Sequence, residues 1–551
     1  MKRYLIAAAF FLSACSKNTM PDPESGIADS KVNHAIAHSA PGDVVGKITV
    51  GYQGWFSCAG DGSPFSFFWW HWAQGNNFPT GEASSIGIKS WPDMREFTTS
   101  FQTGFPNLNN GQPAKLFSSY TDQTMDTHFR WMEENGIDVA ALQRFNPAGG
   151  EGPMRDAITA KVKTAAEAHH RKFYIMYDVS GWDGMSTQIK ADWTNKMSAY
   201  TSSSAYAVQN GKPVVCIWGL GFKDNSRPFS AEECMDVVNW FKSKGCYVIG
   251  GVPGRWRSEN EHRPGFEAVY KALNMITPWM IGNIGTIEDE DRFYQNTVMG
   301  DQAYCDANGI DYQACILPGD LQERQRQHGE FMWRQFYNRV KGGVQGIYIS
   351  MFDEFNEGNQ IAKTAENNFM VPAGSKFLGL DEDGVVCSSD YYLRLTNDGG
   401  KMLKGIIPLT PNRPTEPVKG GGQVYLPPFG QTVSIMGSNG AYVSSQNGVN
   451  PMNCVNKVAG GWELFTIVNA GNGKVALMNN GKYVSSENGA GSITCNRTAI
   501  GIWEQFTYTK NLAGEVTFMG SNGKFISSEN GLQAMTCKNT VAGPWEKFKL
   551  N

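Results

Sequence analysis

Between residues 48 and 392, short apolar runs rich in β-branched and aromatic residues alternate with longer segments whose apolar residues recur at helical spacing. This alternation is typical of parallel strands joined by helical crossovers. We expect eight strands, at residues 48–55, 139–145, 172–180, 213–219, 247–253, 276–282, 312–319 and 346–354. The clearest helices are expected at residues 125–135, 156–170, 231–243 and 324–340. Eight such units predict an α/β fold of the (β/α)8 TIM barrel type over residues 46–408.

An open, doubly wound sheet is the alternative fold for the same pattern. Its nucleotide-binding form has a G-x-G-x-x-G turn after the first strand. The residues that follow the run 48–55 contain no such turn. The barrel is therefore the favoured prediction.

The chain past residue 430 repeats itself at offsets of 41 and 42 residues. The segment that begins at Asn439 returns at Asn480 and again at Asn522. Each copy leads to a cysteine and then to Trp-Glu-x-Phe, at Cys454, Cys495 and Cys537 and at Trp462, Trp503 and Trp545. Three copies of this period predict an all-β trefoil over residues 431–551.

By their repetition, the three tryptophans and three cysteines are expected to be core residues related by pseudo-threefold symmetry. If the trefoil binds carbohydrate, the polar turns around Asn447, Asn488 and Asn530 are the better candidates. Residues 409–430 are rich in proline and glycine and are expected to be an interdomain linker.

The N-terminus resembles a secretion signal. Lys2 and Arg3 precede an apolar run at residues 4–12, which is too short to span a bilayer and ends in Leu-Ser-Ala-Cys. This ending resembles a bacterial lipobox, so residues 1–15 are expected to be a lipoprotein signal in which Cys15 is the lipidated residue. An ordinary cleaved signal that happens to precede a cysteine is the alternative. Residues 16–45 are expected to be a flexible tether, and the protein is expected to be extracytoplasmic and membrane-anchored, in the periplasm or at the cell surface.

Composition excludes several classes of protein. Lys and Arg number 48 against 52 Asp and Glu, so no basic face for nucleic acid is indicated. Charged residues are only 18% and aromatic residues 12%, which excludes a disordered chain. The 8 histidines show no metal-site spacing, and no cofactor motif is visible. Cysteine spacing does not reveal pairing: Cys305 and Cys315 are candidates for a disulfide or for two buried thiols.

Candidate chemistry lies at the end of the eighth predicted strand, where Glu354 and Glu357 are three residues apart. Working residues of a (β/α)8 barrel lie at the carboxyl ends of its strands. Cleavage of a glycosidic bond uses one carboxyl group to protonate the departing oxygen and a second group to assist at the sugar. A pair of surface carboxylates, or one bound to a helix N-terminus, is the alternative interpretation. Asp353 is expected to point the other way, because neighbouring strand residues face opposite sides.

The stretch Glu354-x-x-Glu357-Gly358-x-Gln360-Ile361 resembles the catalytic Glu-Trp-His-Glu-Gly-Thr-Gln-Ile segment of glycoside hydrolase family 99, the endo-α-1,2-mannosidases and mannanases. Family 71, the α-1,3-glucanases, is a more distant likeness. The resemblance implies a (β/α)8 barrel and a retaining, substrate-assisted mechanism without a covalent enzyme intermediate. In it, Glu354 would deprotonate the sugar 2-hydroxyl and Glu357 would protonate the leaving oxygen. Because Phe355-Asn356 replaces the Trp-His of the family, the specificity for mannose does not carry over. The trefoil repeats resemble the fascin type.

Other residues near strand ends are candidates for binding the substrate. The loop after the first strand holds the aromatic run at residues 67–72, whose rings suit stacking on sugars. The candidates for substrate binding are Trp70, His71, Trp72, Arg144, Asp178, Trp218, Arg255, Trp279 and Asn356. The alternatives are that the rings are buried beneath their loop and that the charged residues are structural ion pairs.

The sequence therefore predicts a glycoside hydrolase that cleaves an α-linked polysaccharide or oligosaccharide, endo-acting on an α-mannan as the first hypothesis, with no cofactor and with a lipid anchor. A second hypothesis is a non-catalytic glycan-binding surface lipoprotein. A third is an exo-acting hydrolase of the xylosidase or arabinosidase type in the same barrel, which long loops at residues 56–120 and 282–310 would favour if they closed one end of the cleft.

Overall fold

A computed structural model describes residues 38–551 except 66–67, 76, 83, 420–426, 472–473 and 511–513. The predicted signal with Cys15, most of the predicted tether, Phe67 and the centre of the predicted linker lie outside the described residues. Among the residues described, none of the helices is long and apolar enough to cross a membrane.

Eight parallel strands form a closed barrel. They follow one another around it in the order β5-β4-β1-β11-β10-β9-β8-β7, and β5 pairs with β7 to close it. Their bounds are β1 Ile48–Tyr52, β4 Val139–Arg144, β5 Lys172–Asp178, β7 Lys212–Trp218, β8 Tyr247–Pro253, β9 Met275–Trp279, β10 Asp311–Ile316 and β11 Gly346–Ile349. All eight predicted strands and the (β/α)8 barrel are confirmed.

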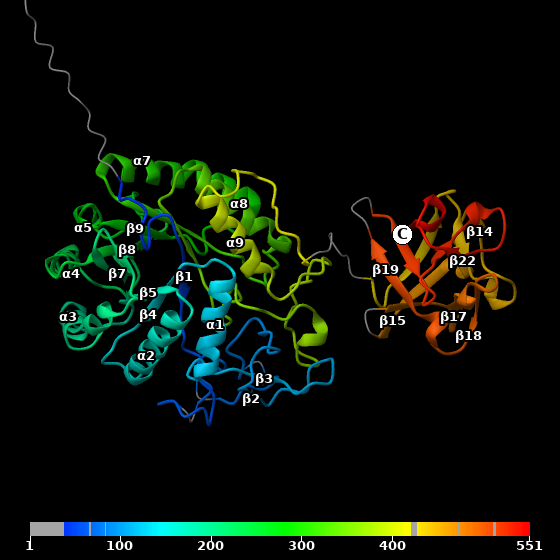
Figure 1. The fold of residues 1–551 in the computed structure, drawn as a ribbon, viewed down its shortest axis with the longest axis horizontal. Helices are drawn as coiled ribbons and strands as arrows, with labels where there is room; N and C mark the ends of the chain where they lie inside the picture. The colour runs from blue at the N-terminus through cyan, green and yellow to red at the C-terminus, as the bar shows by residue number, and fades with distance from the viewer. Residues whose placement is uncertain are drawn as a thin grey trace, which may run out of the picture.

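Helices lie between the strands and cover the outside of the barrel (Figure 1). Their bounds are α1 Asp122–Glu134, α2 Gly152–Ala168, α3 Met185–Asn195, α4 Ala231–Ser243, α5 Phe266–Ala272, α6 Ile287–Phe293, α7 Met299–Asn308, α8 Glu330–Lys341 and α9 Tyr391–Leu403. Helix α4 has its predicted bounds, because Ser230 and Glu233 form a reciprocal capping box at its start. Helix α8 begins at Glu330 rather than at residue 324, because Arg324, Gln327 and His328 have positive φ.

Short elements complete the barrel region. Strands β2 Phe101–Gln102 and β3 Lys115–Leu116 pair in the loop after β1, and β6 Val208–Gln209 pairs with β7. Residues 38–45, the end of the predicted tether, pack on the barrel: Val44 is fully buried, and Ser39 donates its backbone N–H to Asp311. The packed part of the barrel region therefore includes residues that precede the predicted boundary at residue 46.

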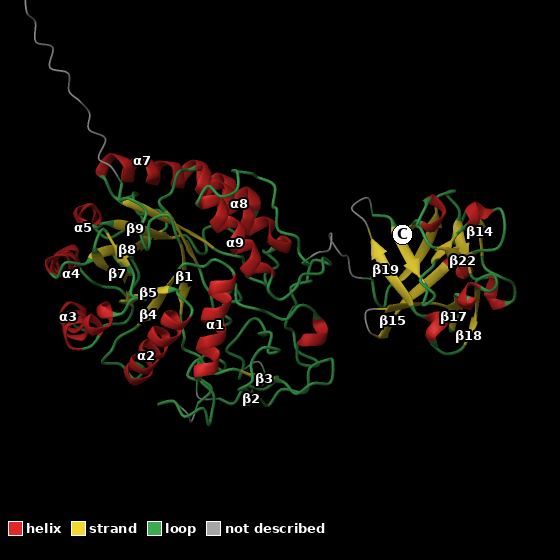
Figure 2. Cartoon of the chain, viewed as in Figure 1, coloured by secondary structure: helices red, strands yellow, loops and turns green. Residues whose placement is uncertain are grey.

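In the described part of residues 431–551, the regular elements are strands and one-turn helices (Figure 2). The strands are β12 Thr432–Gly437, β13 Tyr442–Ser444, β14 Asn453–Asn456, β15 Leu464–Gly471, β16 Lys474–Asn479, β17 Lys482–Ser485, β18 Thr494–Arg497, β19 Phe506–Lys510, β20 Val516–Met519, β21 Phe525–Ser527, β22 Thr536–Asn539 and β23 Phe548–Leu550. Met452 donates its N–H to Ile493, Ile493 to Met535 and Met535 back to Met452, at 2.8–2.9 Å. This closed ring of three bonds marks the pseudo-threefold axis of the predicted trefoil.

The trefoil core differs in part from its prediction. Cys454, Cys495 and Cys537 are buried, as expected, and every described cysteine, Cys305 and Cys315 included, is a free thiol. The prediction that the repeat tryptophans are core residues is wrong: Trp462, Trp503 and Trp545 are 51%, 40% and 41% exposed. The phenylalanine three residues after each tryptophan is the buried member of the Trp-Glu-x-Phe motif, at Phe465, Phe506 and Phe548.

Candidate active site

Glu354 and Glu357 lie at the tip of a tight hairpin beyond β11. The strand ends at Ile349 rather than at residue 354, and the chain then pairs with its own return: Ile361 donates its N–H to Met351, at 3.0 Å. At the tip, the N–H of Glu357 bonds to the carbonyl of Glu354 at 3.2 Å. This turn holds both glutamates at the carboxyl end of the barrel, where active sites of this fold lie.

Glu354 is the buried member of the pair. Its side chain is 5% exposed, and its Oε1 accepts a hydrogen bond from Gln53 Nε2 at 3.1 Å. Its Oε2 is buried and has no hydrogen-bond partner among the described residues. Burial raises the pKa of the Glu354 carboxyl well above its ordinary value, and the charges of Glu357 and Asp353 add to the rise.

Glu357 is the exposed member of the pair. The pKa of its carboxyl is also raised, by partial desolvation and by the charge of Asp320, against the opposing charge of Lys89. Lys89 and Asp320 form an ion pair of 2.6 Å, so Glu357 lies beside a nearly neutral pair. The two glutamates titrate as an interacting unit, in which one carboxyl retains a proton after the other has lost its own.

Asp353 lies beyond the end of β11, so the strand alternation on which its prediction rested does not apply to it. Its carboxylate accepts the backbone N–H groups of Gln53 and Gly54, each at 2.8 Å. Burial raises the pKa of Asp353 to about 6. Asp353 therefore joins the hairpin to the end of β1, and Gln53 is held where its amide reaches Glu354.

Some aromatic side chains of the loop after β1 are partly exposed, and others are buried in the core. His71 stacks on Trp55, with ring centroids 3.7 Å apart, and Trp70 donates its indole N–H to Glu151 at 3.3 Å. Burial lowers the pKa of His71, while Glu151 opposes the shift. Both predicted residues are only partly exposed. The prediction for Trp72 is wrong: it is 0% exposed and donates its indole N–H to the carbonyl of Phe117 at 2.8 Å.

Arg144 is a second correction, because it is a structural ion-pair residue. It is 1% exposed and forms two hydrogen bonds of 2.6 Å to the buried Asp192 and a third of 2.7 Å to Asp156. All three contacts lie at the side of the barrel wall formed by α2 and α3. Arg144 consequently has no surface with which to bind substrate.

Asp178, Trp218 and Trp279 lie at the ends of β5, β7 and β9. Asp178 is paired in register with Trp218, and its charge contributes to the raised pKa of Glu354. The ring of Trp218 meets that of Trp279 edge to face at 5.2 Å, and Trp279 in turn lies 6.4 Å from Tyr348. Burial raises the pKa of Asp178. Asp178 is therefore linked to Glu354 through its charge, and Trp218 links the end of β7 to Trp279.

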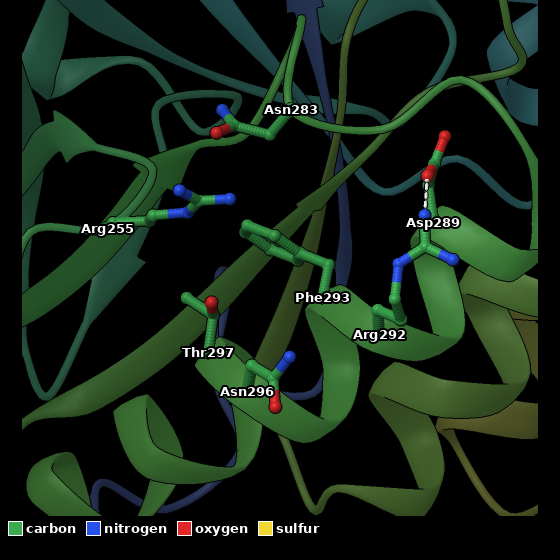
Figure 3. Close-up of a pocket in the computed structure, with 7 residues that line it drawn as sticks. All are labelled: Arg255, Asn283, Asp289, Arg292, Phe293, Asn296 and Thr297. Carbon is green, nitrogen blue, oxygen red and sulfur yellow. Dashed lines mark hydrogen bonds and ion pairs between the residues drawn. The ribbon is translucent and has the colours of Figure 1, made fainter.

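Arg255 lies apart from the glutamates, in a pocket of about 450 Å³ at the ends of β8 and β9. Figure 3 shows its guanidinium group facing Asn283 over the ring of Phe293, whereas Arg292 turns toward Asp289. The pocket is also lined by Asn296 and Thr297, but by neither glutamate. The glutamates are absent from the lining of this pocket, and the role of Arg255 in binding substrate stays a prediction.

Asn356 is half-buried, and its Oδ1 has no partner in the described part of the chain. Its neighbour Phe355 is buried against Phe56, Trp72 and Phe117. Of the two residues between the glutamates, Phe355 therefore belongs to the core, whereas Asn356 is partly open to solvent.

Sequence reasoning missed the roles of Gln53 and Glu151. Gln53 directly follows an apolar strand, which is the available signal for it. Glu151 gave no signal, because its contacts with Trp70 and His71 join loops far apart in the chain. No group of three metal-ligating side chains occurs among the residues that the structure describes.

No protein-family model matches the chain, and no curated protein matches it. Among solved structures, the family 99 endo-α-mannosidase of Bacteroides thetaiotaomicron is similar at 15% identity, with a TM-score of 0.48 over 66% of this chain and 98% of that chain. The designed threefold-symmetric protein ThreeFoil (16% identity, TM-score 0.20) and SeviL bound to asialo-GM1 saccharide (10% identity, TM-score 0.20) are each similar over 22% of this chain and 96% and 95% of their own chains.

Proposed function

We propose that the barrel is a glycoside hydrolase that cleaves an α-linked polysaccharide or oligosaccharide, with α-mannan as the first substrate to test. The observation that carries this proposal is the environment of the hairpin tip. It presents one buried carboxyl group, one oxygen of which has no hydrogen-bond partner among the described residues, and a second carboxyl group, open to solvent, three residues later. Glycosidic cleavage uses two carboxyl groups with different proton affinities at one sugar.

In the proposed reaction, Glu354 takes the proton of the sugar 2-hydroxyl, and the resulting oxygen attacks the anomeric carbon of the same sugar. The bond to the leaving group breaks, and Glu357 gives its proton to the departing oxygen. Water then opens the strained ring at the anomeric carbon, losing a proton to Glu357 while Glu354 returns its proton to the 2-oxygen. The two inversions at one carbon yield retention, and both carboxyl groups recover their starting states.

Burial favours the proton on Glu354 in the empty site, whereas this reaction needs Glu354 ionised. The hydrogen bond from Gln53 favours the ionised form, and its benefit grows as substrate excludes water. A raised pKa also makes the ionised Glu354 a stronger base for a hydroxyl group. In the opposite assignment, Glu354 is the acid. The two assignments differ in which glutamate variant loses turnover mainly on substrates with poor leaving groups.

The test begins with a product screen against α-mannans, α-glucans and arabinoxylans, followed by variants on the polymer that is cleaved. Glu357→Gln is expected to lose turnover on that polymer far more than on an activated aryl glycoside, because the latter needs no acid. Glu354→Gln is expected to lose turnover on both while binding persists. Glu323→Gln, an exposed carboxylate in the loop after β10, is the matched control.

Near-native rates for Glu354→Gln would refute the proposed chemistry. Equal losses for Glu357→Gln on both substrates would remove Glu357 from the acid role. Binding of a polymer without any product, by the unmodified protein, would instead favour a glycan-binding protein. The proposal includes a lipid anchor at Cys15, which metabolic labelling with a fatty acid tests, with Cys15→Ser as the control.

A further inference from the structure

The trefoil exposes one tryptophan from each repeat. Trp462, Trp503 and Trp545 occupy equivalent positions, and each keeps between 40% and 51% of its surface in solvent. Because the ring of bonds through Met452, Ile493 and Met535 defines a pseudo-threefold axis, the three indoles form a ring around that axis. Single exposed apolar residues are ordinary, but three large ones at equivalent positions require a reason.

Each indole is held on a rigid turn. The carbonyl group of each tryptophan accepts the N–H of a serine in the same repeat, at 2.8–2.9 Å, from Ser445, Ser486 and Ser528. The glutamate after each tryptophan is buried, and its carboxylate accepts a backbone N–H at 2.8 Å from Gly460, Gly501 and Gly543. Charge-assisted bonds of this kind fix the backbone, so little conformational entropy remains for a ligand to remove.

The fold does not use the outer faces of these rings. The trefoil core is closed by the phenylalanine of each motif and by aliphatic residues. Among the described residues, none of the three indoles has an aromatic neighbour, and none donates a hydrogen bond from its ring nitrogen. Each indole therefore combines exposed apolar surface with an N–H donor, which is the combination that a sugar ring with its hydroxyl groups complements.

We propose that Trp462, Trp503 and Trp545 form three equivalent platforms on which the trefoil binds sugar units of a neutral polysaccharide. A polysaccharide repeats one unit many times, so it can occupy three equivalent sites. A protein partner would instead bury one contiguous interface in which a few residues contribute most of the binding energy. Each platform alone is weak, but three on one rigid body raise the avidity by about 10²–10⁴ when one polymer, or several chains of a matrix, engages them together. Occupancy of the trefoil would hold the barrel at its substrate.

The test is native gel electrophoresis of the full chain with soluble α-mannan, α-glucan or arabinoxylan in the gel. All variants are made in the Glu354→Gln background, so that the polymer remains intact. Retardation by at least one polymer is expected, with each of Trp462→Ala, Trp503→Ala and Trp545→Ala weakening it by a similar factor, about tenfold. The triple variant, which has no platform left, is expected to lose its retardation altogether, and Trp→Phe at all three sites is expected to restore part of it.

Val449→Ser combined with Leu532→Ser is the matched control, because both residues are exposed aliphatics of the same repeats, 78% exposed each. This double variant is expected to be retarded like its parent. Thermal unfolding of every variant shows that the trefoil remains folded. An unchanged triple variant, a parent retarded by none of the polymers, or one tryptophan that carries the whole effect would each overturn the proposal.

The outcome is independent of the proposed hydrolase. Binding to the gel needs no cleavage, so retardation persists if the barrel has no activity. Conversely, in the native Glu354 background, the triple tryptophan variant is expected to hydrolyse a short aryl glycoside at the parental rate while losing rate on the polymer. A loss of rate on the short substrate would show that the tryptophans contribute to hydrolysis itself. It would refute the proposal that they bind the polymer separately from the barrel.

Discussion

Replacing Gln53 with methionine tests whether Glu354 titrates in the reaction. The side chain of Gln53 donates to Glu354 Oε1, while its own Oε1 is buried without a partner in the described residues. Methionine has a similar volume and no donor, so Gln53→Met removes the bond without opening a cavity. The backbone contacts of residue 53 with Asp353 and Arg155 do not involve the side chain and remain.

The size of the effect follows from the bond that is lost. A hydrogen bond to a charged group contributes about 1.5–3 kcal/mol, and one pKa unit corresponds to about 1.4 kcal/mol. The bond favours the ionised carboxylate, so its loss raises the pKa of Glu354 by about 1–2 units. If Glu354 is the base, the active form is the ionised one. The acid limb of kcat/KM then moves to higher pH by the same amount.

The assay is the pH dependence of kcat/KM on a substrate that the native protein cleaves. The control is Gln313→Met, since Gln313 is also a buried barrel glutamine with one side-chain bond of 3.1 Å, to the neutral Thr49 hydroxyl, and an unpartnered Oε1. Both limbs of the kcat/KM profile of Gln313→Met are expected to stay at the pH values of the native protein. If Gln53→Met shifts the alkaline limb of the kcat/KM profile instead, Glu354 is the acid. If neither limb moves, the pKa values that limit kcat/KM do not belong to Glu354.

Two further predictions concern the corrected site residues. Arg144→Met leaves Asp192 buried without its cation. The free energy of unfolding, measured by urea denaturation, is therefore expected to fall by about 3–5 kcal/mol. A loss below about 1 kcal/mol would contradict the buried ion pair. Trp72→Phe removes the indole donor of the Phe117 carbonyl, which keeps only its weaker bond from the Cys58 thiol at 3.2 Å. The substitution is expected to cost about 1–3 kcal/mol, with KM unchanged on the cleaved substrate. A raised KM at native stability would return Trp72 to the binding surface.

The barrel was accessible to sequence reasoning because its signal is local. Each of its strands is a short apolar run that is buried along nearly its whole length, as in β1 and β4, and such runs alternate with segments of helical period. The glutamates were accessible for a related reason, since polar residues directly after the last buried strand must lie at the barrel mouth. The register of the hairpin was not accessible, because it depends on pairing between residues 351–352 and 361–362.

Arg144 and Trp72 show what sequence position alone leaves undetermined. Arg144 is the last residue of β4, and Trp72 lies in the loop after β1, and both are places where a binding residue would lie. The partners that bury them, Asp192 and Phe117, come from distant segments. The trefoil tryptophans are the reverse case. Repetition made them resemble core residues, yet the core of a small trefoil is filled by one large residue of each motif, and that residue is the phenylalanine.

The unequal environments of Glu354 and Glu357 arise from tertiary contacts rather than from their spacing. Two carboxyl groups in one turn repel each other equally, so spacing alone cannot decide which retains the proton. Asp353 draws the end of β1 against the hairpin and so buries Glu354, while Glu357 stays on the solvent side near Lys89. Burial and mutual repulsion then leave one proton on the pair over the pH range between its two apparent pKa values. Within that range the site holds one donor and one acceptor at once, and the proposed reaction proceeds from the form in which the proton lies on Glu357 and Glu354 is ionised.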